Sequence, residues 1–138
     1  MNGYLLDTHA WLWVQRGERN ELSPAFVGEL EQYQRRGEVF VSAISILEIA
    51  RLVASGGFDL GMSVEQFLDE GTADGGFRLL DLSPRILIGS TRLPGKLHRN
   101  PSDRLLIATA RDHGLTLITR DRDILTYART GHLSARKL

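Results

Sequence analysis

The chain has 138 residues, of which 42% are hydrophobic and 25% are charged, and its formal net charge is zero. These values are typical of one soluble domain, spanning residues 1–138, and exclude nucleic-acid binding through overall positive charge. The absence of cysteine excludes disulfides, thiolate metal sites and a cysteine nucleophile. No apolar run approaches the ~20 residues of a membrane span, and the N-terminus lacks a signal-peptide pattern, so we expect a cytoplasmic protein without a membrane partner.

Short apolar runs predict strands at residues 4–6, 39–41, 77–82 and 115–119, with a further edge strand near 132–135. Amphipathic patterns between these runs predict helices. Their expected starting points, in chain order, are Asp7, Ser23, Ser42 or Ser45, Ser63, Ser83, Asp103 and Arg120.

Strands that alternate with helices predict a parallel sheet covered on both faces. We therefore expect a three-layer α/β/α fold with a central parallel sheet. The sequence contains no internal repeat, low-complexity tract or linker that would divide it.

Four carboxylates fall where such a sheet would gather them. Asp7 and Asp121 follow the apolar runs 4–6 and 115–119, so both belong to strand-to-helix turns at the carboxyl edge of the sheet, where open α/β sheets bind ligands. Glu48 lies in an apolar helix, in a narrow polar stripe, and Asp103 begins the most apolar helix. We expect the four to converge on one rim.

Two of these acids also have a purely structural explanation. Asp7 follows a strand and precedes a helix, which is a favoured position for an N-cap. Asp121 suits a first helical turn, as does its neighbour Asp123, because the helix dipole favours acids there.

The other two acids have alternatives of the same kind. Asp103 would help cap its helix, with Ser102 as the N-cap. Glu48 would face solvent and pair with Arg51, three residues along the same helix.

Convergence of the four carboxylates would require a counter-charge. Two like charges ~4 Å apart repel by about 4 kcal/mol at an effective dielectric constant near 20. A divalent cation removes this repulsion, and a site made only of oxygen ligands favours Mg²⁺ or Mn²⁺ over zinc. Such a cation also lowers the pKa of a bound water and stabilises charge on a phosphoryl oxygen.

Four ordered motifs carry a resemblance to a known family. They are LLDTHAWLW at residues 5–13, SAISILEI at 42–49, HRNPSDRLLIATA at 98–110 and LITRD at 117–121. Together they resemble the acidic motifs of PIN-domain ribonucleases, specifically the VapC-type toxins of bacterial toxin–antitoxin pairs. The resemblance spans almost the whole chain.

That resemblance implies an endoribonuclease that hydrolyses RNA phosphodiester bonds with Mg²⁺ or Mn²⁺. It implies Thr8 and Thr119 as hydroxyls that support the metal ligands, a cognate antitoxin whose tail occupies the acidic groove, and a homodimer. The implied catalytic and metal-binding residues are Asp7, Glu48, Asp103 and Asp121. Relatives with the same third motif often carry Asp where this chain has Asn100, which we do not count as a ligand.

Arginines beside the acids are candidates for contact with RNA phosphates, because guanidinium matches phosphate geometry. They are Arg99, Arg104, Arg120 and Arg122. Each is as readily explained as a solvated or ion-paired surface residue. For Trp11 and Trp13, packing is favoured over stacking on bases.

Other functional classes fit the sequence less well. A dinucleotide-binding fold would carry a glycine-rich turn after the first strand, where this chain has Asp7, Thr8 and His9. The alternative that stays open is a non-catalytic PIN-fold module that binds RNA or a protein partner.

Overall fold

The structure is a computed structural model, and it describes residues 3–97 and 100–138. The elements within these residues, in chain order, are β1 Tyr4–Leu6, α1 Thr8–Arg16, α2 Pro24–Arg35, β2 Val39–Ser42, α3 Ala43–Ala54, α4 Val64–Gly71, β3 Arg78–Leu80, α5 Pro84–Gly89, α6 Pro101–His113, β4 Thr116–Thr119, α7 Arg122–Ala128 and β5 Ala135–Lys137. The predicted edge strand near 132–135 is present but begins later, at Ala135.

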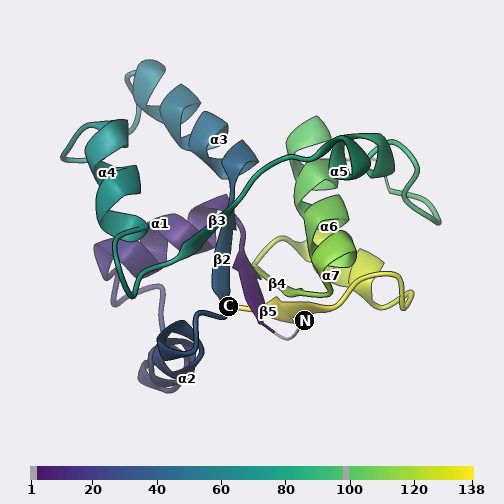
Figure 1. Cartoon of the computed structure of the whole chain (residues 1–138), viewed down its shortest axis with the longest axis horizontal. Coiled ribbons are helices and arrows are strands. Elements are labelled where there is room, and N and C mark those ends of the chain that lie inside the picture. Colours follow the sequence, from purple (N-terminus) through teal and green to yellow (C-terminus); the bar gives the residue numbers. More distant parts are fainter. Residues whose placement is uncertain (1–2, 98–99) are drawn as a thin grey trace.

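The five strands form one sheet in the order β3-β2-β1-β4-β5, and every neighbouring pair is parallel. Figure 1 shows α1, α2 and α4 on one side of this sheet and α5, α6 and α7 on the other. The predicted three-layer α/β/α fold is confirmed. Within β1, Leu5 belongs to one hydrophobic cluster, whereas Tyr4 and Leu6 belong to the other, as the two-residue period of a strand requires.

Helix starts follow the capping residues that the sequence offers. The hydroxyls of Ser23, Ser63 and Ser83 each accept a hydrogen bond from the backbone N–H three residues later. Nowhere in the described residues does a helix combine the length and apolar composition that crossing a bilayer would need.

The start of α6 differs from the prediction. The helix begins at Pro101 rather than Asp103, and its N-cap is Asn100 rather than Ser102. The Asn100 side-chain oxygen accepts a hydrogen bond from Asp103 N at 3.0 Å. A proline is favoured at the first helical position because the missing N–H needs no partner there. Asp103 therefore sits in the first turn.

The chain order of the sheet creates a crevice. From β1 the chain adds β2 and then β3 on one side of the sheet. It then returns and places β4 on the other side of β1, with β5 beyond β4. In such sheets the point where the order reverses leaves a gap between diverging connections at the carboxyl ends of the strands. Here that point lies between β1 and β4, and the residues that follow these strands are Asp7 and Arg120-Asp121.

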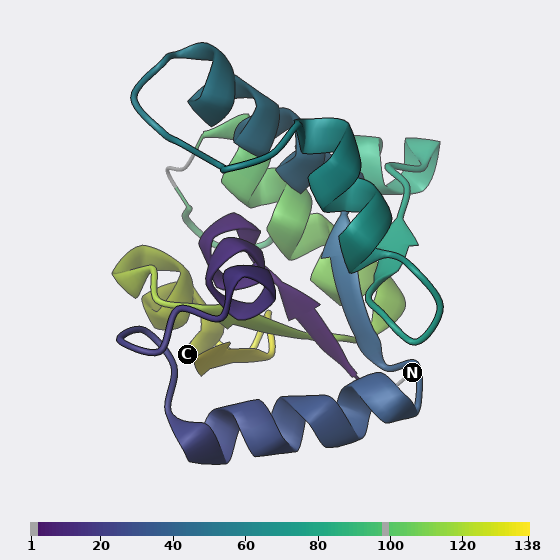
Figure 2. The same cartoon turned by 90° about the vertical axis from the view of Figure 1, so that its left-hand side faces the viewer.

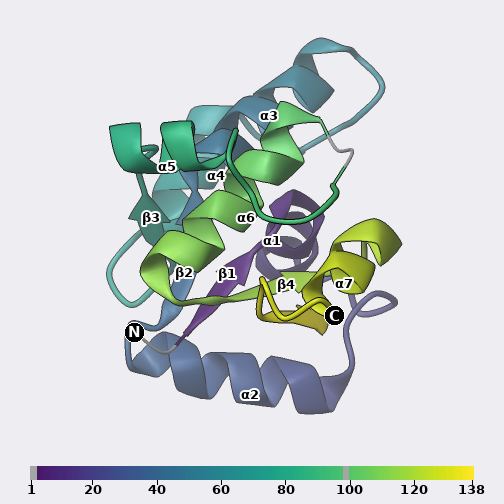
Figure 3. The same ribbon diagram turned by 90° about the vertical axis from the view of Figure 1, so that its right-hand side faces the viewer.

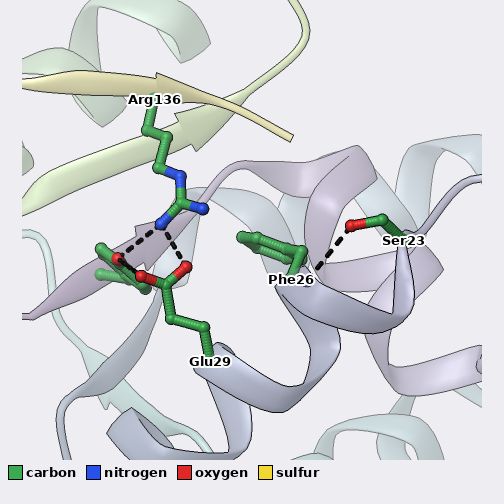
Figure 4. Close-up of polar contacts among 5 residues, drawn as sticks. Ser23, Phe26, Glu29 and Arg136 are labelled. Carbon is green, nitrogen blue, oxygen red and sulfur yellow. Dashed lines mark hydrogen bonds and ion pairs between the residues drawn. The ribbon is translucent and has the colours of Figure 1, made fainter.

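The last strand is fastened to α2 across the sheet. Arg136 of β5 donates hydrogen bonds to Glu29 of α2 and to the Tyr4 hydroxyl, and its guanidinium lies over the ring of Phe26 (Figure 4). Burial raises the pKa of Tyr4 to about 12, so its hydroxyl remains a donor to Glu29. Figure 2 shows α2 near the start of β1 and α1 at its end, so this fastening lies away from the crevice.

Candidate active site

A cavity of about 400 Å³ lies at the crevice between β1 and β4. All four predicted acids line it: Asp7, Glu48, Asp103 and Asp121. They come from four different places in the fold, namely the end of β1, the middle of α3, the first turn of α6 and the turn after β4. The structure thus brings together around one cavity the carboxylates that the sequence separates by more than 100 positions.

Asp7 has two functions at the end of β1. Its Oδ1 accepts a hydrogen bond from Ala10 N at 2.8 Å, so it is the N-cap of α1. Burial raises the pKa of the Asp7 carboxyl, and the charge of Asp103 adds to this, whereas a hydrogen bond with the Thr119 side chain opposes it. The cap and the cavity wall are therefore the same carboxylate.

Glu48 is held toward the cavity by a hydroxyl of α1. Thr8 Oγ1 donates to Glu48 Oε1 at 2.5 Å and lies 2.9 Å from Ser45 Oγ. Burial also raises the pKa of Glu48, with the charge of Asp103 adding to it. The alternative in which Glu48 pairs with Arg51 in solvent does not hold, since the carboxylate is half-buried and no ion pair joins the two among the described residues.

Asp121 repeats the arrangement of Asp7 on the neighbouring strand. Its Oδ1 accepts hydrogen bonds from Asp123 N at 2.9 Å and Ile124 N at 3.0 Å, which makes it the N-cap of α7. Its own N–H donates to Thr119 Oγ1 at 3.0 Å. The Thr119 hydroxyl, fully buried at the end of β4, thus contacts the acids of both strand ends.

The donor set of the cavity fits a hard divalent cation. Its walls offer mainly carboxylate and hydroxyl oxygens, the ligands of Mg²⁺ and Mn²⁺, whereas His9 is the one imidazole among its described lining residues and there is no thiolate. The raised pKa values of Asp7 and Glu48 indicate desolvated carboxyls that a cation would compensate. As the side chains stand, no three acidic or histidine groups among the described residues form a cluster tight enough to hold a metal ion.

Of the three proposed RNA-contacting arginines that the structure describes, Arg104, Arg120 and Arg122, it is Arg120 that lines this cavity. Its guanidinium is already engaged, because it donates hydrogen bonds to the carboxylate and the backbone carbonyl of Glu21 and lies 4.5 Å from the Trp13 ring centre. Arg120 thereby ties the segment between α1 and α2 to the cavity wall.

The other three arginines lie elsewhere or outside the described residues. Arg104 donates to the carbonyl oxygens of Ser90 and Leu97, both at 2.8 Å, and so fixes the loop before α6. Arg122 is exposed at the start of α7. Arg99 lies outside the described residues.

Two aromatic side chains of the cavity wall were not among the predicted site residues. His9 and Trp13 both line the cavity, and their ring centres are 5.7 Å apart. The available signal was their spacing, since residues four apart on a helix share a face and His9 directly follows Asp7-Thr8. Trp11, by contrast, is buried, as packing predicts.

A larger cavity does not carry the acids. A volume of about 780 Å³ lies between α1, α2 and the end of α4, and its lining is mostly apolar but includes Arg19, Glu31 and Glu70. Catalysis on a phosphodiester requires groups that bind cations or move protons, so the smaller cavity is the candidate active site.

Replacing Asp7 by Asn should stabilise the metal-free protein. Asn caps a helix as well as Asp does, while the substitution removes a desolvated charge, so we expect a gain of about 1 kcal/mol in the free energy of unfolding at pH 7. The pKa of Asp7 is raised in the folded state, so the Asp7 carboxyl of the wild type becomes protonated and neutral as the pH falls. The difference in free energy of unfolding between the two proteins should therefore shrink toward pH 4. Chemical denaturation in EDTA measures both effects.

The matched control is Asp81→Asn, which neutralises an exposed aspartate outside the cavity and should leave stability nearly unchanged. A loss of stability in Asp7→Asn at pH 7 would contradict the assignment of Asp7 as a destabilising buried charge.

Comparison with known proteins adds a family to this geometry. The PIN domain family matches residues 4–130. Ribonuclease VapC22 of Mycobacterium tuberculosis is 31% identical over 127 residues, which cover 92% of this chain and 93% of that protein.

Solved structures show the same fold. The VapBC2 complex of Rickettsia felis, bound to a DNA fragment from its promoter, aligns with a TM-score of 0.72 at 18% identity, over 100% of this chain and 99% of that one. DNA-bound VapBC from Salmonella typhimurium aligns with a TM-score of 0.68 at 16% identity, over 99% and 98%. The chain belongs to the PIN-domain family and, within it, to the VapC-type ribonucleases.

Proposed function

We propose that this chain is a toxin that cleaves RNA within the strand, using Mg²⁺ or Mn²⁺ held by Asp7, Glu48, Asp103 and Asp121. The observation that carries the proposal is that four carboxylates from separate segments line one cavity at the switch point of the sheet. Two of them have a raised pKa, which fits a site designed for a cation rather than for solvent.

The residues around the acids have distinct tasks in this mechanism. A bound divalent cation would supply an acidified water and positive charge beside the scissile phosphate. Thr8 holds Glu48 by its hydrogen bond, and Thr119 links the carboxyl of Asp7 to the backbone of Asp121. These contacts restrict the carboxylates to the cavity wall, so that less conformational entropy is lost when they bind a cation.

The metal-dependent ribonuclease activity can be tested with one ligand variant. Asp103→Asn should lower the rate of RNA cleavage by about 100-fold or more, because one ligand contributes several kcal/mol of charge stabilisation. EDTA should abolish cleavage by the wild type, and Mg²⁺ or Mn²⁺ should restore it. The assay follows a labelled single-stranded RNA on a denaturing gel.

Asp81→Asn is the control and should cleave at the wild-type rate. Equal rates for Asp103→Asn and the wild type would refute the site. RNA binding without cleavage by the wild type would instead favour the alternative, a non-catalytic RNA-binding module.

A small antitoxin is the proposed protein partner. Its support is the fold shared with toxin–antitoxin complexes from Rickettsia felis and Salmonella typhimurium. The cavity is acidic, so a basic side chain of the antitoxin tail would complement it and would occupy the position of the cation and the substrate.

Expression of the chain alone should therefore arrest bacterial growth, because free toxin cleaves cellular RNA. Co-expression of the adjacent small gene should restore growth, as measured by colony counts after induction. Arrest by the Asp103→Asn variant at the wild-type level would show that toxicity does not depend on the site.

We further propose a homodimer that covers α5. Leu87 and Ile88 are large aliphatic side chains that are 46% and 52% exposed on this helix. Consecutive exposed aliphatic side chains of this kind favour contact with another protein surface. A second copy of the chain would bury them.

The variant Ile88→Glu should convert a dimer into a monomer, because a charge in the centre of an apolar interface loses its hydration without a partner. Light scattering after size-exclusion chromatography measures the mass. Met62→Glu, at an exposed apolar residue outside α5, should leave the dimer intact. A monomeric wild type would contradict the proposal.

A further inference from the structure

A second cavity of about 570 Å³ adjoins the acidic one. Thr8, His9, Glu48 and Asn100 line both volumes, so these four side chains form their common boundary. We call the second volume the α3 groove. It lies between α3 and the start of α6, two helices that pack against each other (Figure 3).

The polar stripe of α3 leads from the acids into this groove. Its members, Ser45, Glu48, Arg51 and Ser55, follow one another at intervals of three or four residues, so they share a face of the helix. Ser45 is fully buried and lies against Thr8, Glu48 is half-buried between the two cavities, and Arg51 and Ser55 are exposed. The stripe therefore runs from the catalytic acids outward along the α3 groove.

Arg51 is the cation of this stripe. Two arginines of the described residues line the two cavities, and the other, Arg120, is bound to Glu21 and stacked on Trp13. No salt bridge or hydrogen bond of the Arg51 guanidinium is found within residues 3–97 and 100–138. It lies one helical turn beyond Glu48, so its charge is placed next to the acidic site without neutralising it.

We propose that the α3 groove binds the RNA nucleotide next to the cleaved bond and that Arg51 binds the phosphate of that nucleotide. The inference rests on the proposed ribonuclease function. A neutral protein with an acidic active site needs a local positive charge to hold a polyanion, and a planar guanidinium binds phosphate through two parallel hydrogen bonds.

The remaining walls of the groove suit the rest of a nucleotide. Ile44, Leu47 and Leu52 give it an aliphatic side, against which a ribose or the face of a base can pack. His9 is exposed at the boundary of the two cavities, where a strand that passes from one to the other must cross it. Single-stranded RNA is commonly held by stacking its bases on such rings.

RNA binding can be measured without cleavage in the full chain carrying Asp7→Asn, which keeps the helix cap. Fluorescence anisotropy with a labelled single-stranded RNA 12-mer in Mg²⁺ compares this protein with and without Arg51→Gln. We expect about a tenfold increase in Kd from the loss of one phosphate contact. The slope of log K against log salt should also fall by about 0.7, the value for one phosphate on a single strand.

The matched control is Arg35→Gln. Arg35 is an exposed arginine on α2, which lies near the start of β1 and so at the far end of that strand from Asp7 (Figure 2). It should change neither the affinity nor the salt slope. Equal effects of the two substitutions would overturn the inference. Unchanged RNA affinity together with weaker antitoxin binding in Arg51→Gln would also overturn it, in favour of a protein-binding groove.

Cleavage by the otherwise wild-type chain locates the contact along the strand. Arg51→Gln should raise KM about tenfold and leave kcat unchanged. A neutral methylphosphonate linkage can be placed next to the cleaved bond on its 5′ or its 3′ side. On one of the two sides it should raise the KM of the wild type about as much as Arg51→Gln does, and it should change the KM of Arg51→Gln little. Wild-type insensitivity to both linkages would refute the contact. Absence of any cleavage by the wild type would refute the proposed function, while the anisotropy measurement would still decide the inference.

Discussion

The confinement of like charges at one edge of the sheet is the constraint on which the rest of this structure depends. The parallel strands β1 and β4 are neighbours, and the acids that follow them, Asp7 and Asp121, line the same cavity. Burial and the charge of Asp103 raise the pKa of both Asp7 and Glu48. In the absence of a cation these groups oppose folding, which is a common cost of sites arranged for catalysis.

The fold tolerates these charges because the carboxylates of Asp7, Asp121 and Glu48 also have structural partners. Asp7 and Asp121 use Oδ1 to cap α1 and α7, where the positive end of the helix dipole favours an anion. The Glu48 carboxylate accepts a hydrogen bond from the hydroxyl of Thr8. Asp7 can therefore be both a helix cap and part of the site, because one carboxylate oxygen accepts the capping hydrogen bond and the other remains available to the cavity.

The arginines near the acids also have structural partners. Arg120 and Arg104, although close to the acids in sequence, are occupied by Glu21 and by the carbonyls of Ser90 and Leu97. These contacts shape the cavity wall and the loop before α6 rather than offer charge to a ligand. A net charge of zero thus leaves the location of the arginine side chains, and not their number, to decide where a polyanion can bind.

The sequence by itself determined the elements whose rules are local. Apolar runs and serine caps predicted the parallel sheet and most helix starts, because strand period and capping depend on residues within four positions of one another. Local rules failed at α6, where Asn100 rather than Ser102 is the N-cap.

Only the tertiary structure decided which side chains face the acids. The hydrogen bond between Arg120 and Glu21 spans 99 positions, and the position of the α3 groove beside the acidic cavity depends on how α3 packs against α6. Such distances follow from the packing of whole elements on the sheet, which no short stretch of sequence encodes.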